Sequence, residues 1–121
     1  MRAILAGVLA LGIPTGYAAA DVPQRQVEMV RASYYGPGFD GRATASGCRF
    51  DQWSNTAASR TLPLGTVLRV TNPANGRSEL VIILDRGPYV HGRTLDLSRG
   101  TARRLGIEAQ GVATVHLERL Q

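Results

Sequence analysis

Two hydrophobic runs in the middle of the chain predict β-strands. The first covers residues 67–72 (VLRVTN) and the second covers residues 79–84 (ELVIIL), and both are rich in β-branched side chains. Asn75 and Gly76 lie between the runs, and this pair favours the positive φ angles of a tight hairpin turn. Because the second run is apolar on both faces, we expect its strand to be covered on both sides, as in a closed barrel or a sandwich core.

The C-terminal part of the chain predicts a helix followed by another strand. Ser98 is a suitable N-cap for the helix, and Gly106 can supply the left-handed residue that ends it. Residues 112–120 alternate between apolar and polar side chains, as a half-buried strand does. Several short strands, many turns and one or two short helices predict a mainly β fold, a small barrel with its own core.

The N-terminus has the pattern of a secretory signal peptide. Arg2 precedes an apolar run at residues 3–13, and three alanines at residues 18–20 offer a small-residue cleavage site before Asp21. The alternatives are a membrane anchor and a buried helix. The apolar run is short for an anchor, because a helix that crosses a bilayer needs ~20 apolar residues.

These features predict the domain boundaries and the location of the protein. We expect a signal peptide at residues 1–20, a flexible lead-in at residues 21–30 and a barrel domain at residues 31–121. The mature protein would then lie in the periplasm or the secreted cell envelope, without a transmembrane span. It would not be lipidated, because no cysteine lies beside the cleavage site.

Charge and cysteine content narrow the chemistry. The 14 basic residues, all arginine, exceed the 9 acidic ones. A basic surface fits nucleic acid, an acidic membrane face or an anionic polymer, and export argues against nucleic acid as a partner. Cys48 is the single cysteine, and no paired spacing of metal ligands occurs. We therefore expect no disulfide, no metal site and no cofactor.

Five motifs follow one another along the chain, and together they resemble one known family. They are residues 32–47 (ASYYGPGFDGRATASG), 55–72 (NTAASRTLPLGTVLRVTN), 75–78 (NGRS), 84–98 (LDRGPYVHGRTLDLS) and 111–120 (GVATVHLERL). In this order they resemble the rare lipoprotein A (RlpA-like) family of septal-ring lytic transglycosylases. The resemblance implies a six-stranded double-psi β-barrel with an open groove. It also implies peptidoglycan glycan strands as the ligand, and septal-ring or other envelope proteins as candidate partners.

The resemblance implies an activity and points to catalytic positions. Some members are endolytic enzymes that cut between N-acetylmuramic acid and N-acetylglucosamine and leave an anhydro sugar. That reaction needs a proton donor and then a base, and one carboxyl group can serve as both. The family's usual glutamate and histidine are replaced here by Cys48 and Ser59, whereas Asp85 and Asp51 remain. We take Asp85 and Asp51 as the catalytic candidates.

Each catalytic candidate has a structural alternative. Asp85 could bond turn amides and pair with Arg86, and Asp51 could be a solvated turn residue. Cys48 could be a nucleophile if a cationic neighbour favoured its thiolate, or simply a small, partly buried side chain.

The candidate substrate-binding residues combine aromatic, hydroxyl and cationic side chains. Tyrosine offers a ring face to a sugar, and arginine offers a fork of donors to a carboxylate. Two of the candidates are adjacent tyrosines, so only one of them can face the groove of a strand. The set consists of Tyr34, Tyr35, Thr44, Ser46, Arg60 and Arg86.

Three classes of function remain open from the sequence. The first is a lytic transglycosylase, which the resemblance and Asp85 favour. The second is a noncatalytic glycan-binding or wall-loosening module, which the changes at Cys48 and Ser59 favour. The third is a protein that binds an anionic polymer or a protein partner without sugar chemistry, for which only the arginine excess argues.

Overall fold

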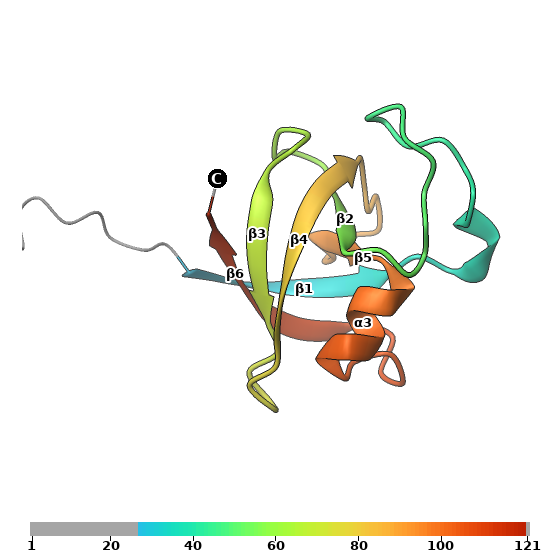
Figure 1. Cartoon of the computed structure of the whole chain (residues 1–121). Helices are drawn as coiled ribbons and strands as arrows, with labels where there is room; N and C mark the ends of the chain where they lie inside the picture. Colours follow the sequence, from blue (N-terminus) through green and yellow to red (C-terminus); the bar gives the residue numbers. More distant parts are fainter. Residues whose placement is uncertain (1–26, 121) are drawn as a thin grey trace, which may run out of the picture.

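Six strands of the computed structural model close into a barrel, and the structure describes residues 27–120 (Figure 1). The expected signal peptide and most of the lead-in lie outside the described residues. The strands are β1 (Val27–Tyr34), β2 (Thr56–Ser59), β3 (Val67–Thr71), β4 (Ser78–Asp85), β5 (Leu95–Leu97) and β6 (Ala113–Arg119). The 3-10 helix η1 (Pro37–Phe39) follows β1, and the α-helix α3 (Arg99–Leu105) precedes β6. β1 therefore begins inside the segment that was expected to be the lead-in.

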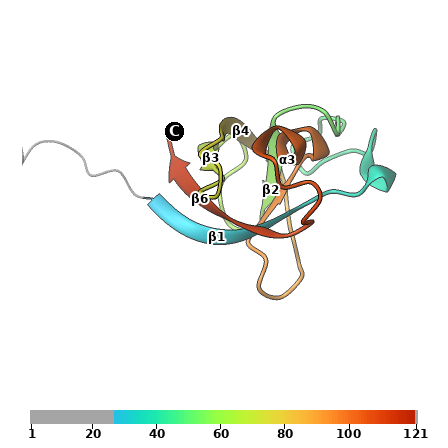
Figure 2. The same ribbon diagram turned by 90° about the horizontal axis from the view of Figure 1, so that it is seen from below.

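The strand order around the barrel is β1-β5-β2-β4-β3-β6. β1 pairs with β5 in parallel, and β2 pairs with β4 in parallel, whereas the other four pairings are antiparallel. Figure 2 shows β1 and β6 running side by side along one wall. The mainly β fold with a closed six-stranded barrel is therefore confirmed.

The hairpin predicted between the two central runs is confirmed. β3 and β4 pair from Thr71 and Ser78 inward, and Gly76 adopts a positive φ of 79° in the connection. The side chain of Asn72 accepts a hydrogen bond from the amide of Ala74 and donates one to the carbonyl oxygen of Leu105. The turn is therefore also attached to the end of α3.

The expectation that β4 is covered on both faces is wrong. Val81 and Ile83 are fully buried, but Leu80 and Ile82 are 48% and 42% exposed. Successive side chains of a strand point to opposite faces, and only the inner face of this barrel wall is packed. The apolar run correctly predicts a strand, but its outward-facing Leu80 and Ile82 are only partly covered.

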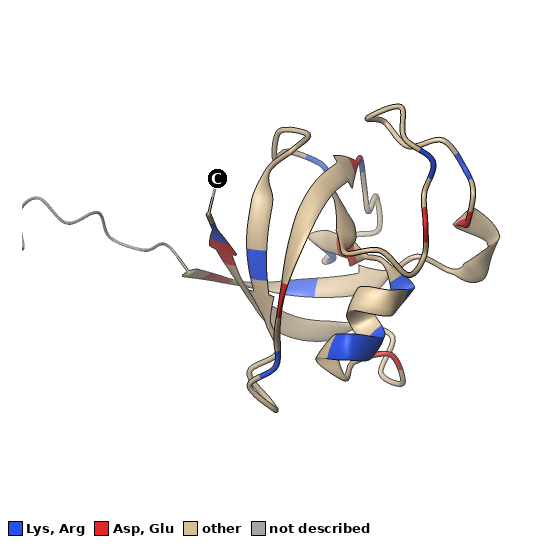
Figure 3. Cartoon of the chain, viewed as in Figure 1, with Lys and Arg blue, Asp and Glu red and all other residues tan. Residues whose placement is uncertain are grey.

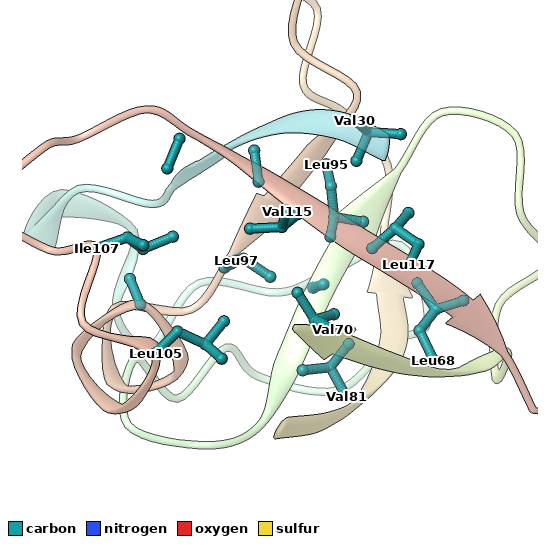
Figure 4. Packing of buried hydrophobic residues seen from close by; sticks show 14 of the residues in the cluster. Val30, Leu68, Val70, Val81, Leu95, Leu97, Leu105, Ile107, Val115 and Leu117 are labelled. Atoms are coloured by element: carbon teal, nitrogen blue, oxygen red, sulfur yellow. The ribbon is translucent and has the colours of Figure 1, made fainter. Parts of the chain in front are cut away.

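The core fills the inside of the barrel with aliphatic side chains from all six strands and the α3 region (Figure 4). Leu105 at the end of α3 and Ile107 just beyond it close one end of this core. Ala113, Val115 and Leu117 point inward from β6, which confirms its predicted alternation.

Helix α3 has the predicted caps and packs against the turn around Trp53. The Ser98 hydroxyl accepts from the amide of Thr101 at 3.1 Å, and Gly106 is left-handed with φ 78°. A Cβ added at Gly100 would lie 2.7 Å from the carbonyl oxygen of Trp53. Glycine at position 100 therefore lets α3 approach the turn around Trp53 closely.

No helix within residues 27–120 is long and apolar enough to cross a membrane.

Candidate functional site

Two pockets share Tyr35 and Asp85, and together they form what we call the Asp85 cleft. The Thr44 pocket is lined by Tyr35, Thr44, Arg49, Phe50, Asp51, Ser54, Thr56, Ala57, Leu84 and Asp85. The Arg93 pocket is lined by Tyr35, Phe39, Asp85, Arg86, Gly87, Pro88, Tyr89, Val90, Arg93 and Asp96. The cleft is thus built by the ends of β1 and β4, by residues of β2 and β5 and by the loops between these strands.

Asp85 ends β4 and is held by donors from three segments. The Tyr35 hydroxyl donates to Oδ2 at 2.8 Å. The backbone amides of Ala45 and Arg86 each donate to Oδ1 at 2.9 Å. Its carboxylate is therefore fixed in orientation at the junction of the two pockets.

Tyr35 is the tyrosine of the pair that faces the cleft. Tyr35 is 8% exposed, and its ring packs on Phe50 with ring centroids 4.6 Å apart. Burial, with a further contribution from Asp85, raises the pKa of the Tyr35 hydroxyl far above its ordinary value, so this group remains a neutral donor. Tyr34 instead packs against the core and donates to the carbonyl oxygen of Glu108 at 2.9 Å.

A second carboxyl group, Asp96, lines the cleft and was missed by the sequence analysis. The Ser33 hydroxyl donates to its Oδ1 at 2.6 Å. Burial raises the pKa of Asp96, and the negative charge of Asp85 acts in the same direction. The Ser33 hydrogen bond and the charge of Arg93 oppose this rise in the pKa of Asp96. A carboxyl group in such surroundings is a candidate proton donor.

The signal for Asp96 in the sequence was weak. Asp96 lies between Leu95 and Leu97, which are both fully buried. In a strand, a polar residue between two core leucines is expected to face solvent. Here the outward face of β5 faces the cleft, and local alternation cannot reveal this.

The loop after η1 forms the rim of the Thr44 pocket. The Thr44 hydroxyl lies 2.8 Å from the Ser46 hydroxyl and donates to the carbonyl oxygen of Cys48 at 2.8 Å. The Ser46 amide donates to the carbonyl oxygen of Leu84, which places this loop against the end of β4. Thr44 is thus a lining residue, and Ser46 supports the loop.

The other catalytic candidate, Asp51, is exposed and forms a turn. Its Oδ1 accepts from the amide of Trp53 at 2.9 Å, and its carbonyl oxygen accepts from the Ser54 hydroxyl. Asp51 does line the Thr44 pocket together with Asp85. It is held by one donor to its carboxylate, whereas Asp85 has three.

The two altered family positions have different surroundings. Ser59 is 4% exposed, and its hydroxyl accepts from the amides of Thr61 and Leu62 at 3.2 and 3.0 Å. It lines neither pocket of the cleft and caps a turn instead. Cys48 is exposed on the loop that contacts Asp85.

The arginines expected to bind carboxylates are anchored to backbone carbonyls. Arg86 donates from Nη1 to the carbonyl oxygens of Ser59 and Leu62 at 2.9 and 2.7 Å. Arg60 donates from Nη1 to the carbonyl oxygens of Pro88 and Arg93. Within residues 27–120, the side chain of Arg86 forms no ion pair with Asp85, and only its backbone amide reaches that carboxylate. These two arginines therefore hold the loops around the cleft.

The described residues contain no cluster of three or more His, Cys, Asp or Glu side chains that could hold a metal ion.

The strand order and the cleft define a class of protein, the small double-psi β-barrels. The Streptomyces papain inhibitor aligns with a TM-score of 0.64 at 23% identity, over 84% of this chain and all of that one. An apo expansin from Clavibacter michiganensis aligns with a TM-score of 0.62 at 22% identity, over 79% of this chain and 51% of that one. These likenesses show the fold.

Sequence comparison then gives the family. Residues 27–117 match the family described as "Lytic transglycolase", and the chain belongs to it. A "Probable endolytic peptidoglycan transglycosylase RlpA" from Synechocystis is 57% identical over 90 residues, which cover 74% of this chain and 28% of that protein. The "Endolytic peptidoglycan transglycosylase RlpA" of Campylobacter jejuni is 48% identical over 87 residues, which cover 72% and 32%. The chain thus spans about a third of the length of these relatives, and the resemblance to the rare lipoprotein A family is confirmed.

Proposed function

We propose that this protein is an endolytic lytic transglycosylase that cuts peptidoglycan glycan strands between N-acetylmuramic acid and N-acetylglucosamine. The observation that carries the proposal is the pair of carboxyl groups, Asp85 and Asp96, which line one pocket together with the buried Tyr35. The activity in the names of the RlpA relatives supports the choice of substrate.

Asp96 is the proton donor in this proposal. Its raised pKa favours the protonated form, which can give its proton to the glycosidic oxygen as the bond from that oxygen to C1 of N-acetylmuramic acid breaks. The C6 hydroxyl of the same sugar then bonds to C1, and its proton returns to the Asp96 carboxylate. The product is an anhydro sugar, no water is consumed, and Asp96 ends in its starting state.

Asp85 supplies fixed negative charge in the same proposal. Positive charge develops at C1 when the glycosidic bond breaks, and a preorganised carboxylate stabilises it. The three donors to Asp85 hold it in place, so little reorganisation is needed during the reaction. Asp51 then contributes to the rim of the cleft, and its carboxylate is the weaker catalytic candidate.

A second candidate function is a noncatalytic glycan-binding or wall-loosening module. The observation that favours it is the environment of Ser59, which is buried and occupied with two turn amides at the position of the family's usual histidine. Cys48 likewise offers a thiol where the family usually has a carboxyl group. Under this alternative the cleft binds glycan, and the two aspartates serve as hydrogen-bond acceptors.

The proposed location is the cell envelope. It is supported by the signal-peptide pattern of residues 1–20 and by the peptidoglycan activity in the relatives' names. Septal-ring or other envelope proteins are the partners we propose there, on the basis of the family resemblance alone.

The test is incubation with purified sacculi and with peptide-free glycan strands, followed by mass spectrometry of the soluble products. We expect anhydro-sugar products from the native protein and none from Asp96→Asn. Glu28→Gln, which removes an exposed carboxylate on β1, is the matched control and should keep full activity. Binding to sacculi without any release of anhydro sugars would instead support the noncatalytic module.

A further inference from the structure

The backbone of Arg93 is fixed on the loop that leads from β4 to β5. Its amide donates to the carbonyl oxygen of Val90 at 3.2 Å. Its own carbonyl oxygen accepts from Nη1 of Arg60 at 2.9 Å. Arg60 also donates to the carbonyl oxygen of Pro88, so one guanidinium joins the two ends of this loop. The backbone from which the Arg93 side chain extends is therefore held in place.

The guanidinium of Arg93 has no protein acceptor within residues 27–120. Its Nε is buried and has no hydrogen-bond partner, and none of its nitrogens forms an ion pair with a described carboxylate. Buried donors in proteins are almost always satisfied by protein groups, water or a bound ligand, so this guanidinium is free to take an acceptor in the pocket that it lines. The side chain lines the Arg93 pocket beside Asp85 and Asp96, where a substrate would lie.

Other arginines that line the cleft differ from Arg93 in this respect. Arg86 donates to the carbonyl oxygens of Ser59 and Leu62, and Arg49 donates to that of Gly41 at 2.9 Å. Figure 3 shows further basic positions on α3 and on several strands and loops, so the arginine excess is not gathered at the cleft. Overall charge therefore does not explain why an unpaired cation lies in the Arg93 pocket.

We propose that Arg93 binds a carboxylate of the peptidoglycan substrate and thereby makes the cleft selective for anionic glycan. A guanidinium presents two parallel donors that match the two oxygens of a carboxylate. Peptidoglycan offers such groups in two places, the lactyl carboxylate of N-acetylmuramic acid without a stem peptide and the carboxylates of the stem peptide. The inference rests on the proposed function for the polymer that enters the cleft.

Carboxylate binding at Arg93 would also assist the proposed proton donor. The charge of Arg93 lowers the pKa of Asp96, against the effects of burial and of Asp85. A substrate carboxylate paired with Arg93 neutralises that charge, so the bound complex favours protonated Asp96. Arg93 thereby links the binding of an anionic sugar to the protonation of Asp96.

The test measures binding of three soluble probes by isothermal titration calorimetry. They are peptide-free glycan strands, the same strands with carboxyl groups converted to methylamides, and strands that carry stem peptides. The proteins are the native chain, Arg93→Gln, Arg93→Lys and the control Arg31→Gln, which removes the same charge from an exposed site on β1. Thermal melting confirms that each variant is folded.

We expect Arg93→Gln to weaken binding of a carboxylate-bearing probe by about 10- to 100-fold, because a hydrogen-bonded charge contact of this kind is lost. Arg93→Lys should retain part of the affinity, and Arg31→Gln should bind like the native protein. The amidated strands should bind native protein and Arg93→Gln equally. Loss confined to peptide-free strands identifies the lactyl group, and loss confined to peptide-bearing strands identifies the stem peptide.

Three results would overturn the proposal: no loss of affinity in folded Arg93→Gln, an equal loss on amidated strands, or no binding of any probe by the native protein. The reaction is scored separately, by anhydro-sugar products. Carboxylate-dependent binding through Arg93 without those products would therefore contradict the transglycosylase activity and leave the inference on Arg93 supported.

Discussion

The hydroxyl of Tyr35 donates a 2.8 Å hydrogen bond to Oδ2 of Asp85 and so joins the chain just after β1 to the last residue of β4. Tyr35 is shielded from solvent, because its ring is buried between the barrel and Phe50. The contact orients the carboxylate, and both of its residues line the Thr44 pocket as well as the Arg93 pocket. The stability of the barrel and the geometry of the cleft are therefore connected at this point.

Replacement of Tyr35 by phenylalanine should harm both stability and activity. The variant leaves one oxygen of a partly buried carboxylate without its donor, and such a loss costs about 1–3 kcal/mol of the free energy of unfolding. Urea unfolding and anhydro-sugar release measure the two effects. Tyr34→Phe is the matched control, because it also loses one hydroxyl hydrogen bond, to the Glu108 carbonyl, and neither of these residues lines the cleft. An equal loss of activity in folded Tyr34→Phe would contradict the role given to Tyr35.

Asp85→Asn should reduce activity more than Asp51→Asn. Asparagine is nearly the same shape as aspartate, its oxygen can still accept from the amides of Ala45 and Arg86, and the Tyr35 hydroxyl can accept from its NH₂ group. The main loss is the negative charge, so we expect a fall in kcat of about 10²- to 10³-fold, the range for loss of one preorganised electrostatic contact. Melting temperatures should change little in either variant. The ranking is wrong if Asp51→Asn proves the more harmful with both proteins folded.

The pH dependence should follow the raised pKa of Asp96. A carboxyl group whose pKa is higher in the folded state contributes most to stability when it is protonated, below its ordinary value of 3.8. That contribution is lost as pH rises through the higher folded pKa. Activity that needs the protonated form should fall over the same rise in pH.

Asp96→Asn provides the comparison for this prediction. It removes the titrating group and keeps a similar shape, so its free energy of unfolding should rise relative to that of the native protein as pH increases above 3.8. Urea denaturation at a series of pH values from acid to neutral gives this difference. A difference that is flat with pH would show that Asp96 titrates alike in the folded and unfolded chains.

Local patterns in the sequence were enough to predict several elements of the fold. Ser98 and Gly106 cap α3 through contacts a few residues apart, and Gly76 turns the β3–β4 hairpin within its own loop. Such features depend on neighbouring residues, so a single sequence reveals them. The closed barrel with its two parallel pairings brings distant segments together, and the family resemblance was needed to predict it.

The site was only partly predictable for the same reason. Asp85 was found through the family resemblance, but its partner Tyr35 is 50 positions away, and no local pattern joins the two. Asp96 and Arg93 gain their significance from the pocket that they share, whereas in the sequence Asp96 resembles a solvent-facing strand residue and Arg93 a loop residue. Arg60 and Arg86 were expected to meet substrate, yet each donates to two backbone carbonyls. An arginine that binds backbone carbonyls and an arginine that is free to bind substrate look alike in the sequence.

The altered positions Cys48 and Ser59 should respond differently when the family's usual residues are restored. Cys48 is exposed on the loop beside Asp85, so Cys48→Glu should fold normally and place a carboxyl group near the cleft. Ser59 is buried and accepts from two amides, so Ser59→His loses those bonds and overfills the site, at a cost of about 1–3 kcal/mol. Thermal melts and product release on peptide-free strands test both variants and their combination.

If the cleft retains the family's substrate geometry, Cys48→Glu should increase glycan cleavage, because a positioned acid typically contributes about 10²- to 10⁴-fold in rate. The double variant should cleave glycan faster than Cys48→Glu only if it stays folded, because Ser59→His alters a buried turn. Cys48→Ser, which is close in size and adds no carboxyl group, should behave like the native protein. A folded Cys48→Glu variant with native activity would show that position 48 does not reach the reacting bond and that Asp96 and Asp85 carry the chemistry alone.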